Sequence, residues 1–201
     1  MTSFPLQKTT KHGGTLTPFQ QIWPTVPDSA FVFHGAQLVG SVTLGEGVSI
    51  WHNCVLRGDV NHITVGARSN IQDGTMIHVS TRTYPTTIGD DVLVAHKAML
   101  HGCRLESNSF VGMCGIVMDN AVIEPDGMLA AGGMLTPGKT IKHGELWAGS
   151  PAKFVRFVKD TELEKNRGMA EHYRLLAVQH DKDSRGEAVD AVYPFSLKQV
   201  S

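Results

Sequence analysis

The sequence predicts an all-β fold, a single-stranded parallel β-helix with a C-terminal α-helix, and three observations lead to it. An aliphatic residue returns at every sixth position over most of the chain. Two interruptions of this period have the lengths of loops inserted at a corner. The period ends at a proline, and a helical pattern follows. We therefore divide the chain into an N-terminal extension (1–30), the β-helix (31–152), a helical segment (153–181) and a tail (182–201).

The six-residue period is clearest in the second half of the β-helix. The residues in phase there are Leu105, Val111, Val117, Ile123, Leu129, Leu135, Ile141 and Trp147. The period differs from the 3.6 of an α-helix and is a multiple of two, so an extended strand can bury each of these residues. A bend in every hexapeptide then gives triangular coils whose strands stack about 4.8 Å apart. The alternative, a β-sandwich with accidental spacing, is disfavoured by eight consecutive matches.

The earlier repeats keep the same phase across two insertions. They are Leu38, Leu44, Ile50, Leu56, then Val65, Ile71, Ile77, then Ile88, Val94 and Leu100. The first insertion lies around residues 60–62 and the second at residues 81–86. Both are interpreted as corner loops that leave the coil count intact. Leu100 and Leu105 are one residue closer than the period, a small local adjustment.

The two flanks break the pattern. The first thirty residues contain four prolines and are expected to wrap around or trail from the coil. After Pro151, Thr161 and Glu164 have the spacing of a capping box. The residues Leu163, Ala170, Tyr173 and Ala177 form one helical stripe, weakened near Gly168. This predicts a helix packed along the outside of the coil, while residues 182–201 have no clear pattern.

Composition excludes several classes of function. The 201 residues carry a net charge of −1, which gives no broad attraction to nucleic acid or to anionic membranes. Polar residues interrupt every apolar stretch, so no membrane span is expected. The N-terminus lacks the pattern of a secretory signal. Three cysteines without CxxC spacing indicate reduced thiols in a cytoplasmic protein.

Counting repeats brings two histidines together. Leu56, Ile77 and Leu100 are separated by whole coils, so the residues after them should form one outward row. Those residues are Arg57, His78 and His101. One strand spacing between His78 and His101 suits two nitrogens that share a metal at about 2.0–2.1 Å each.

A third histidine, His96, has a different phase. It falls on another face of the triangle, above Asp73 and His52, and a single coil cannot easily bring it to the other two. A neighbouring copy can, because in a threefold homotrimer one face of each subunit meets another face of the next. Three imidazoles with an open fourth position describe a catalytic zinc site, which lowers the pKa of bound water to about 7.

Several segments around these histidines resemble the γ-class carbonic anhydrases, which belong to the hexapeptide-repeat, left-handed β-helix superfamily. The segments are Arg57-Gly58-Asp59, Asn70-Ile71-Gln72-Asp73-Gly74, Met76-Ile77-His78-Val79, Gly89-Asp90-Asp91-Val92 and the run from His96 to Cys103. The resemblance extends from about Ser29 to the C-terminal helix. It also implies the left hand, which the general rule for parallel crossovers does not favour.

The resemblance implies reversible hydration of CO2 to bicarbonate by a metal-bound hydroxide at a subunit interface. The metal on His78, His96 and His101 would be zinc, with iron or cobalt as alternatives. The resemblance implies five further site residues. Gln72 would orient the reacting group, and Asn70 would support Gln72. Arg57 and Asp59 would form a pair that bridges subunits, and Tyr173 would lie near the metal. For Arg57, physical reasoning requires a balancing acid, Asp59 or Asp73 of the adjacent subunit. For Tyr173, simple packing is an equal alternative.

The chain departs from the archetypal enzyme at two glutamates that serve proton transfer. Val60 follows Asp59, and the loop 80–86 has no carboxylate. Activity could therefore be low, unless a group such as His62 substitutes. Three other functions stay open: an acyl-CoA thioesterase using the same hydroxide, a hexapeptide-repeat acyltransferase, whose superfamily shares the segment 149–153, and a catalytically weak scaffold subunit.

Overall fold

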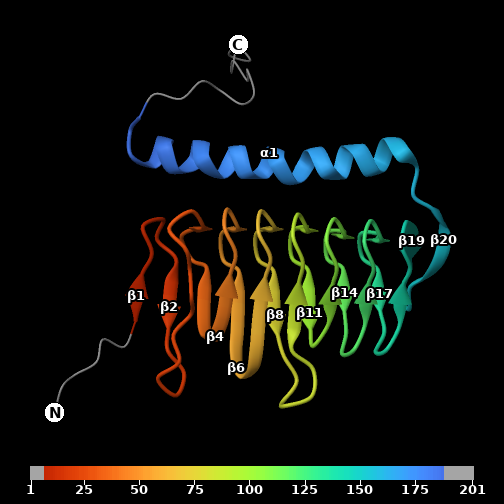
Figure 1. Cartoon of the computed structure of the whole chain (residues 1–201), viewed down its shortest axis with the longest axis horizontal. Helices are drawn as coiled ribbons and strands as arrows, with labels where there is room; N and C mark the ends of the chain where they lie inside the picture. The colour runs from red at the N-terminus through yellow and green to blue at the C-terminus, as the bar shows by residue number, and fades with distance from the viewer. Residues whose placement is uncertain (1–6, 188–201) are drawn as a thin grey trace, which may run out of the picture.

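The computed structural model describes residues 7–187 and shows a left-handed triangular β-helix of about seven turns, with one α-helix laid along it (Figure 1). Short strands form three flat faces, and strands in successive coils pair in parallel. The chain rises through the coil and then returns as the helix towards the coil's N-terminal end. The predicted fold class is confirmed.

The first face carries His78 and His101, and we call it the methionine face because of its outer side chains. Its strands are β2 (Thr15–Thr17), the first halves of β4 (Gln37–Leu44) and β6 (Val55–Val65), then β8 (Met76–His78), β11 (Met99–His101), β14 (Ile116–Val117) and β17 (Met134–Leu135). One outer column on it is formed by Val55, Met76, Met99, Ile116 and Met134.

The second face we call the threonine face. It consists of the second halves of β4 and β6, then β9 (Thr86–Ile88), β12 (Arg104–Leu105), β15 (Val122–Ile123) and β18 (Thr140–Ile141). Its corresponding outer column is formed by Thr43, Thr64, Thr87, Arg104, Val122 and Thr140.

The third face is covered by the helix. Its strands are β3 (Phe31–Val32), β5 (Ser49–Ile50), β7 (Asn70–Ile71), β10 (Leu93–Val94), β13 (Phe110–Val111), β16 (Met128–Leu129) and β19 (Glu145–Ala148). The last strand, β20 (Lys153–Phe157), pairs antiparallel with β19, and β1 (Lys8–Thr9) pairs antiparallel with β2 at the other end.

The core is a ladder of the hexad residues. Leu56 pairs with Ile77, and Ile77 with Leu100, and all three are fully buried. On the threonine face, Val65 pairs with Ile88, so both insertions leave the coil phase intact, as predicted. The corners use residues in the left-handed backbone region, which asparagine and glycine tolerate best.

The first insertion differs from the expected loop at residues 60–62. β6 runs through these residues without a break and turns the corner as a strand. The extra residues are accommodated by a register shift against β4, between Gly40 and Val42. The second insertion is a loop that ends before Thr86, the first residue of β9.

Of the N-terminal extension, residues 1–6 lie outside the described residues, and residues 7–30 are more ordered than expected. β2 pairs in parallel with β4, so residues 15–17 belong to the first coil although they precede residue 31. The backbone of β4 offers an open edge, and pairing satisfies hydrogen bonds that would otherwise need water.

The helix α1 (Asp160–Ser184) does not begin at the predicted capping box of Thr161 and Glu164, which was wrong. Glu162 performs that role: its carboxylate accepts the N–H of Lys159 at 2.9 Å and is held by Arg156 at 2.8 and 2.9 Å. Residues 153–157 form β20 rather than helix. Of the predicted tail 182–201, residues 188–201 lie outside the described residues.

The helix packs on β5, β7 and β10 and stays continuous through Gly168. Ala170 and Ala177 of the predicted stripe are buried, and Ala177 joins a cluster with Phe31, Phe33 and Trp51. No helix within residues 7–187 is long and apolar enough to cross a membrane.

Candidate metal centre

His78 and His101 lie directly above one another on the methionine face. β8 and β11 pair in parallel with His78 opposite His101, as the repeat count predicted. The Nδ1 atom of His78 is 3.1 Å from the Nε2 atom of His101. Two ring nitrogens from residues far apart in sequence therefore converge on one point at the surface of the coil.

Carboxylates hold the far side of both rings. Asp119 Oδ1 lies 2.6 Å from His101 Nδ1, and Asp59 Oδ1 lies 3.0 Å from His78 Nε2. Sequence reasoning missed Asp119. Its signal was present, because Asp119 stands at the corner one coil above Gly102, the residue after His101.

Arg57 finds its balancing acid in its own chain. Its Nη1 donates a close hydrogen bond to Asp59 Oδ2. The subunit-bridging role that the resemblance implies for this pair stays a prediction. Burial acts to raise the pKa of Asp59, but the hydrogen bonds from His78 and Arg57, with the charge of Arg57, hold that pKa below its ordinary value. The carboxylate therefore stays ionised beside His78.

His96 lies outside this pair, at the edge of the helix-covered face. Backbone hydrogen bonds order its corner column as His52, Asp73 and His96, which agrees with the prediction. Asp73 Oδ2 lies 3.1 Å from His96 Nδ1, and the two side chains are 42% and 44% exposed. Because Asp73 engages Nδ1, Nε2 is the nitrogen that His96 can offer to a metal.

The donor set fits a metal such as zinc. Two nitrogens bound tetrahedrally at 2.0–2.1 Å are about 3.4 Å apart, close to the 3.1 Å between His78 and His101. Each imidazole also has a carboxylate on its other nitrogen, the usual support for a metal-binding histidine. Within residues 7–187, no three His, Cys, Asp or Glu side chains of one chain converge on a single metal position.

Three predicted site residues lie on the helix-covered face, with His96 and not with His78 and His101. Gln72 is 2% exposed, and Asn70 donates to Ser49 Oγ at 2.6 Å while its own Oδ1 is buried without a partner among the described residues. The ring centre of Tyr173, from α1, lies 5.9 Å from that of Trp51.

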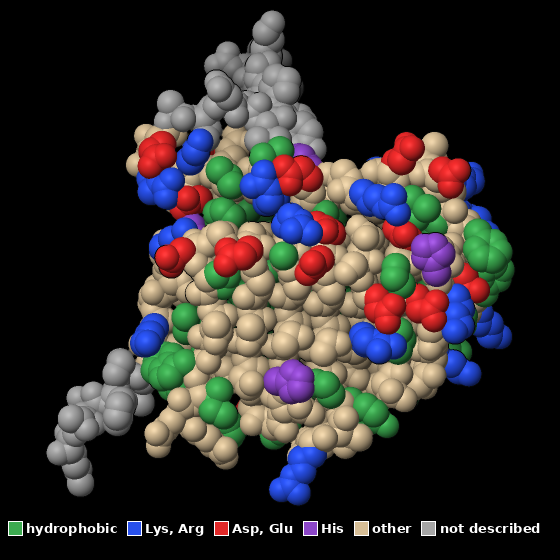
Figure 2. All heavy atoms as spheres, in the orientation of Figure 1, with side chains coloured by type: hydrophobic (Ala, Val, Ile, Leu, Met, Phe, Trp, Pro, Cys, Tyr) green, Lys and Arg blue, Asp and Glu red, His purple; other side chains and the backbone are tan. Residues whose placement is uncertain are grey.

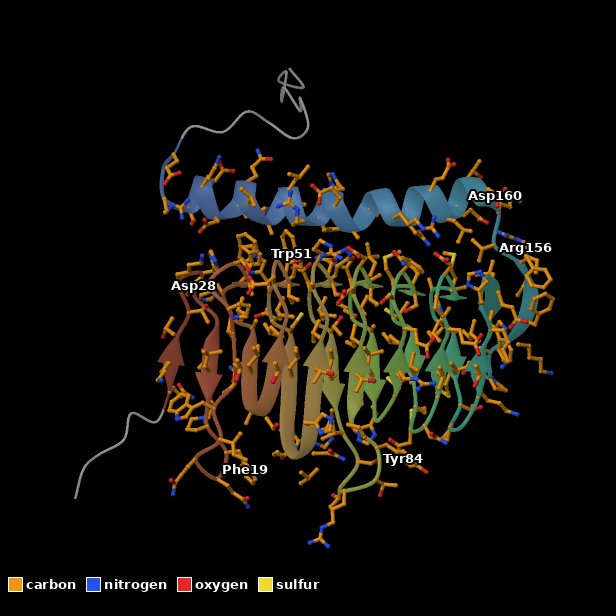
Figure 3. All side chains as sticks on the ribbon, viewed as in Figure 1. Phe19, Asp28, Trp51, Tyr84, Arg156 and Asp160 are labelled. Atoms are coloured by element: carbon orange, nitrogen blue, oxygen red, sulfur yellow. The ribbon has the colours of Figure 1, made fainter. Side chains whose placement is uncertain are left out.

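Two pockets open at the corner beyond the methionine face, on the edge that Figure 3 shows opposite α1, where Phe19 and Tyr84 project. One, of about 220 Å³, is lined by Tyr84, Gly102 and Arg104 beside His101. The other, of about 270 Å³, is lined by Phe19, Asp59 and His62, together with their neighbours. His62, the predicted substitute for a proton-transfer glutamate, thus shares a pocket with Asp59.

The coil and its paired histidines define a hexapeptide-repeat β-helix protein with a candidate metal centre. No family model matches the chain. It is 43% identical over 162 residues to "Gamma carbonic anhydrase 1, mitochondrial" of Arabidopsis thaliana, covering 78% of this chain and 59% of that protein. It is 38% identical over 164 residues to "Protein YrdA" of Escherichia coli, covering 79% and 89%.

Among solved structures, a hexapeptide transferase family protein from Anaplasma phagocytophilum superposes with a TM-score of 0.79 and 46% identity, covering 82% of this chain and 96% of that one. The chain belongs to the γ-carbonic anhydrase-like family. It spans about three fifths of the length of the plant carbonic anhydrases that it matches.

Proposed function

We propose that this protein is a metal-dependent lyase that interconverts CO2 and bicarbonate at sites between the subunits of a homotrimer. One observation carries the proposal: the nitrogens of His78 and His101 stand 3.1 Å apart, each ring backed by a carboxylate. The similarity to proteins named γ-carbonic anhydrases supports the same reaction. Three unpaired cysteines fit the expected cytoplasmic location.

The surfaces around the histidines support assembly. Met99, next to His101, is 37% exposed, and Met113, one coil above His96, is 54% exposed. In Figure 2, the middle of the coil below α1 carries few charged side chains. The charged side chains gather over α1 and at the end of the coil where Figure 1 shows β19 and β20. Apolar surface with methionine favours a protein partner. A second copy, turned about a threefold axis, could bury this surface and bring its His96 to the pair.

A bound zinc ion would act as a Lewis acid and lower the pKa of water towards 7. The amide of Gln72 can donate and accept, so it can orient an oxygen of bicarbonate. Asn70, buried two residues before Gln72 in the same coil, is proposed to support it. Arg57 brings a positive charge close to an anionic product, and Asp59 keeps the Nε2 of His78 occupied. His62 provides an imidazole at the pocket mouth that can pass a proton to solvent.

The test combines metal content with mixing of variants. We expect about one zinc per chain in the wild type and CO2 hydration above background. His78→Ala and His96→Ala should each lose the metal while the coil stays folded. Unfolding and refolding the two together should restore about a quarter of the sites, because only neighbours with complementary ligands form one.

His52→Ala is the matched control, since His52 lies in the same corner column as His96 but two coils away, and it should keep its zinc. Refolding His96→Ala alone should restore no sites. Failure of the mixture to regain metal would contradict a site shared between subunits, and zinc-loaded wild type without hydration activity would contradict the reaction.

Acyl transfer is the competing activity, because the Anaplasma relative is named as a transferase. A panel of acyl-CoA substrates, offered with and without acceptor amines, separates acyl transfer from thioester hydrolysis. Turnover that survives complete removal of zinc by a chelator would favour the transferase.

A further inference from the structure

We infer that Asp119 is a positioning residue that holds His101 through Nδ1 and thereby presents Nε2 to the metal. The inference rests on the proposed metal site. It assigns Asp119 a role that neither the repeat pattern nor the motif comparison identified.

The backbone around Asp119 is fixed from both sides. Asn120 donates its N–H to the carbonyl of Gly102 at 2.7 Å, and Gly138 donates to the carbonyl of Asp119 at 2.9 Å. The corner is thus tied to the coil below and to the coil above. The Asp119 carboxylate lies 2.6 Å from His101 Nδ1, which is the distance of a short charge-assisted hydrogen bond. When Nδ1 carries the proton, the lone pair of His101 is on Nε2, which faces His78.

Gly102 makes room for this contact. A side-chain carbon at position 102 would lie 2.3 Å from Asp119 Oδ1 and 2.9 Å from Tyr84 Cβ, both too close. The backbone at Gly102 also has a φ of +56°, which disfavours other residues. The absence of a side chain after His101 is therefore what allows the carboxylate to reach across the corner.

The three carboxylate–histidine pairs of the candidate metal centre differ in exposure and in whether the carboxylate has a second partner. Asp59 shares its charge with Arg57, and the pair of Asp73 and His96 is more than 40% exposed. Among residues 7–187, Asp119 forms its ion pair with His101 alone, and the two side chains are 32% and 24% exposed. A carboxylate that is not shared with another cation, beside a partly buried ring, fixes the orientation of that ring most firmly. Asp119 should therefore affect metal affinity more than Asp73 does.

The experiment measures the His101 ring and the metal separately. In the metal-free full-length protein, 15N NMR of labelled histidine should show His101 protonated at Nδ1. In Asp119→Ala this preference should be lost. Competition with a chromophoric chelator should then show zinc binding weakened about 10–100-fold. Asp119→Asn, whose amide oxygen can still accept from Nδ1–H, should give intermediate values in both measurements.

Gly102→Ala provides an independent route to the same defect, because it displaces the carboxylate without removing it. Asp91→Asn is the matched control. Asp91 is also at a corner and is paired with Arg68 at 2.6 Å, but it pairs with no histidine among residues 7–187, so the zinc affinity of this variant should equal that of the wild type.

A wild-type His101 protonated at Nε2, or Asp119→Ala with unchanged tautomer and unchanged zinc affinity, would overturn the inference. Wild type that binds no zinc would instead overturn the proposed function, while the NMR measurement would still decide how Asp119 acts on the ring.

Discussion

The methionine face and the threonine face are built from the same repeat and yet have opposite surfaces. Inward, both present fully or nearly fully buried aliphatic residues, such as Leu100 on one and Leu105 on the other. Outward, the position before these residues is polar in the first two strands of the first face, at Thr15 and Gln37, and apolar from Val55 onwards, whereas it is mostly threonine on the second face. The six-residue repeat therefore constrains only the inward residues of the coil. The outward residues can differ between faces according to what each face contacts.

Functional groups follow the same division. His78 and His101 lie on the methionine face, while the threonine face carries pairs such as Lys142 with Glu124, at 3.2 Å, that suit solvent. A face that stays exposed to solvent needs no apolar column. A face that packs against a neighbouring chain, as we propose for the methionine face, gains from one. The comparison can be tested by changing one face at a time.

The largest effect is expected from a charge on the methionine face. In the proposed trimer, Met99→Asp would bury an unpaired carboxylate at each subunit contact, at about 3–5 kcal/mol per contact. The proposed trimer should then dissociate and lose the proposed zinc. Val122→Asp places the same charge at the matching position of the threonine face and should leave the assembly unchanged. Light scattering after size exclusion measures both, and a trimeric Met99→Asp protein would refute the assignment of faces.

The shared interior should respond equally under both faces. Leu100→Ala and Leu105→Ala each remove a side chain that is at most 1% exposed, so each should lower the free energy of unfolding by about 2–5 kcal/mol. Urea denaturation measures this loss. A markedly smaller loss for one of them would show that the two sides of the core are not equivalent.

The helix-covered face adds a third case, in which the chain provides its own cover. His12 is 2% exposed, with Nδ1 2.9 Å from Asp181 of α1, and it packs against Phe31 and Phe33. Burial lowers the pKa of His12 from its ordinary 6.5, although the charge of Asp181 opposes this shift, and the nearby cations Lys11 and Arg185 add to the lowering.

The unfolded chain therefore binds a proton at His12 more readily than the folded chain does. The contribution of His12 to the free energy of unfolding is therefore fully present above pH 6.5. It declines as the pH falls from 6.5 towards the pKa that His12 has in the folded protein, which is lower. His12→Gln should flatten this part of the curve of unfolding free energy against pH. His143→Gln, at a side chain that is 68% exposed, is the control and should keep the wild-type slope. Equal slopes in all three proteins would exclude the effect.

The sequence located the candidate ligands better than it located their surroundings. His78 and His101 could be paired by counting, because every inserted residue is absorbed at a corner and the phase of buried residues is preserved. The start of α1 was misplaced, since Glu162 gains a second partner in Arg156 that only the packing of β20 provides.

By itself, the sequence determined the coil, its phase and the row of outward side chains, because burying one aliphatic residue per hexad is a local and repeated requirement. The sequence count placed Asp73 beside His96, but the tertiary structure alone decided which carboxylates meet His78 and His101. Asp119 reaches His101 only because two corners stack and Gly102 leaves space, and Asp59 turns back to Arg57 within its own chain. Such contacts depend on corner geometry and side-chain direction, which no period in the sequence encodes.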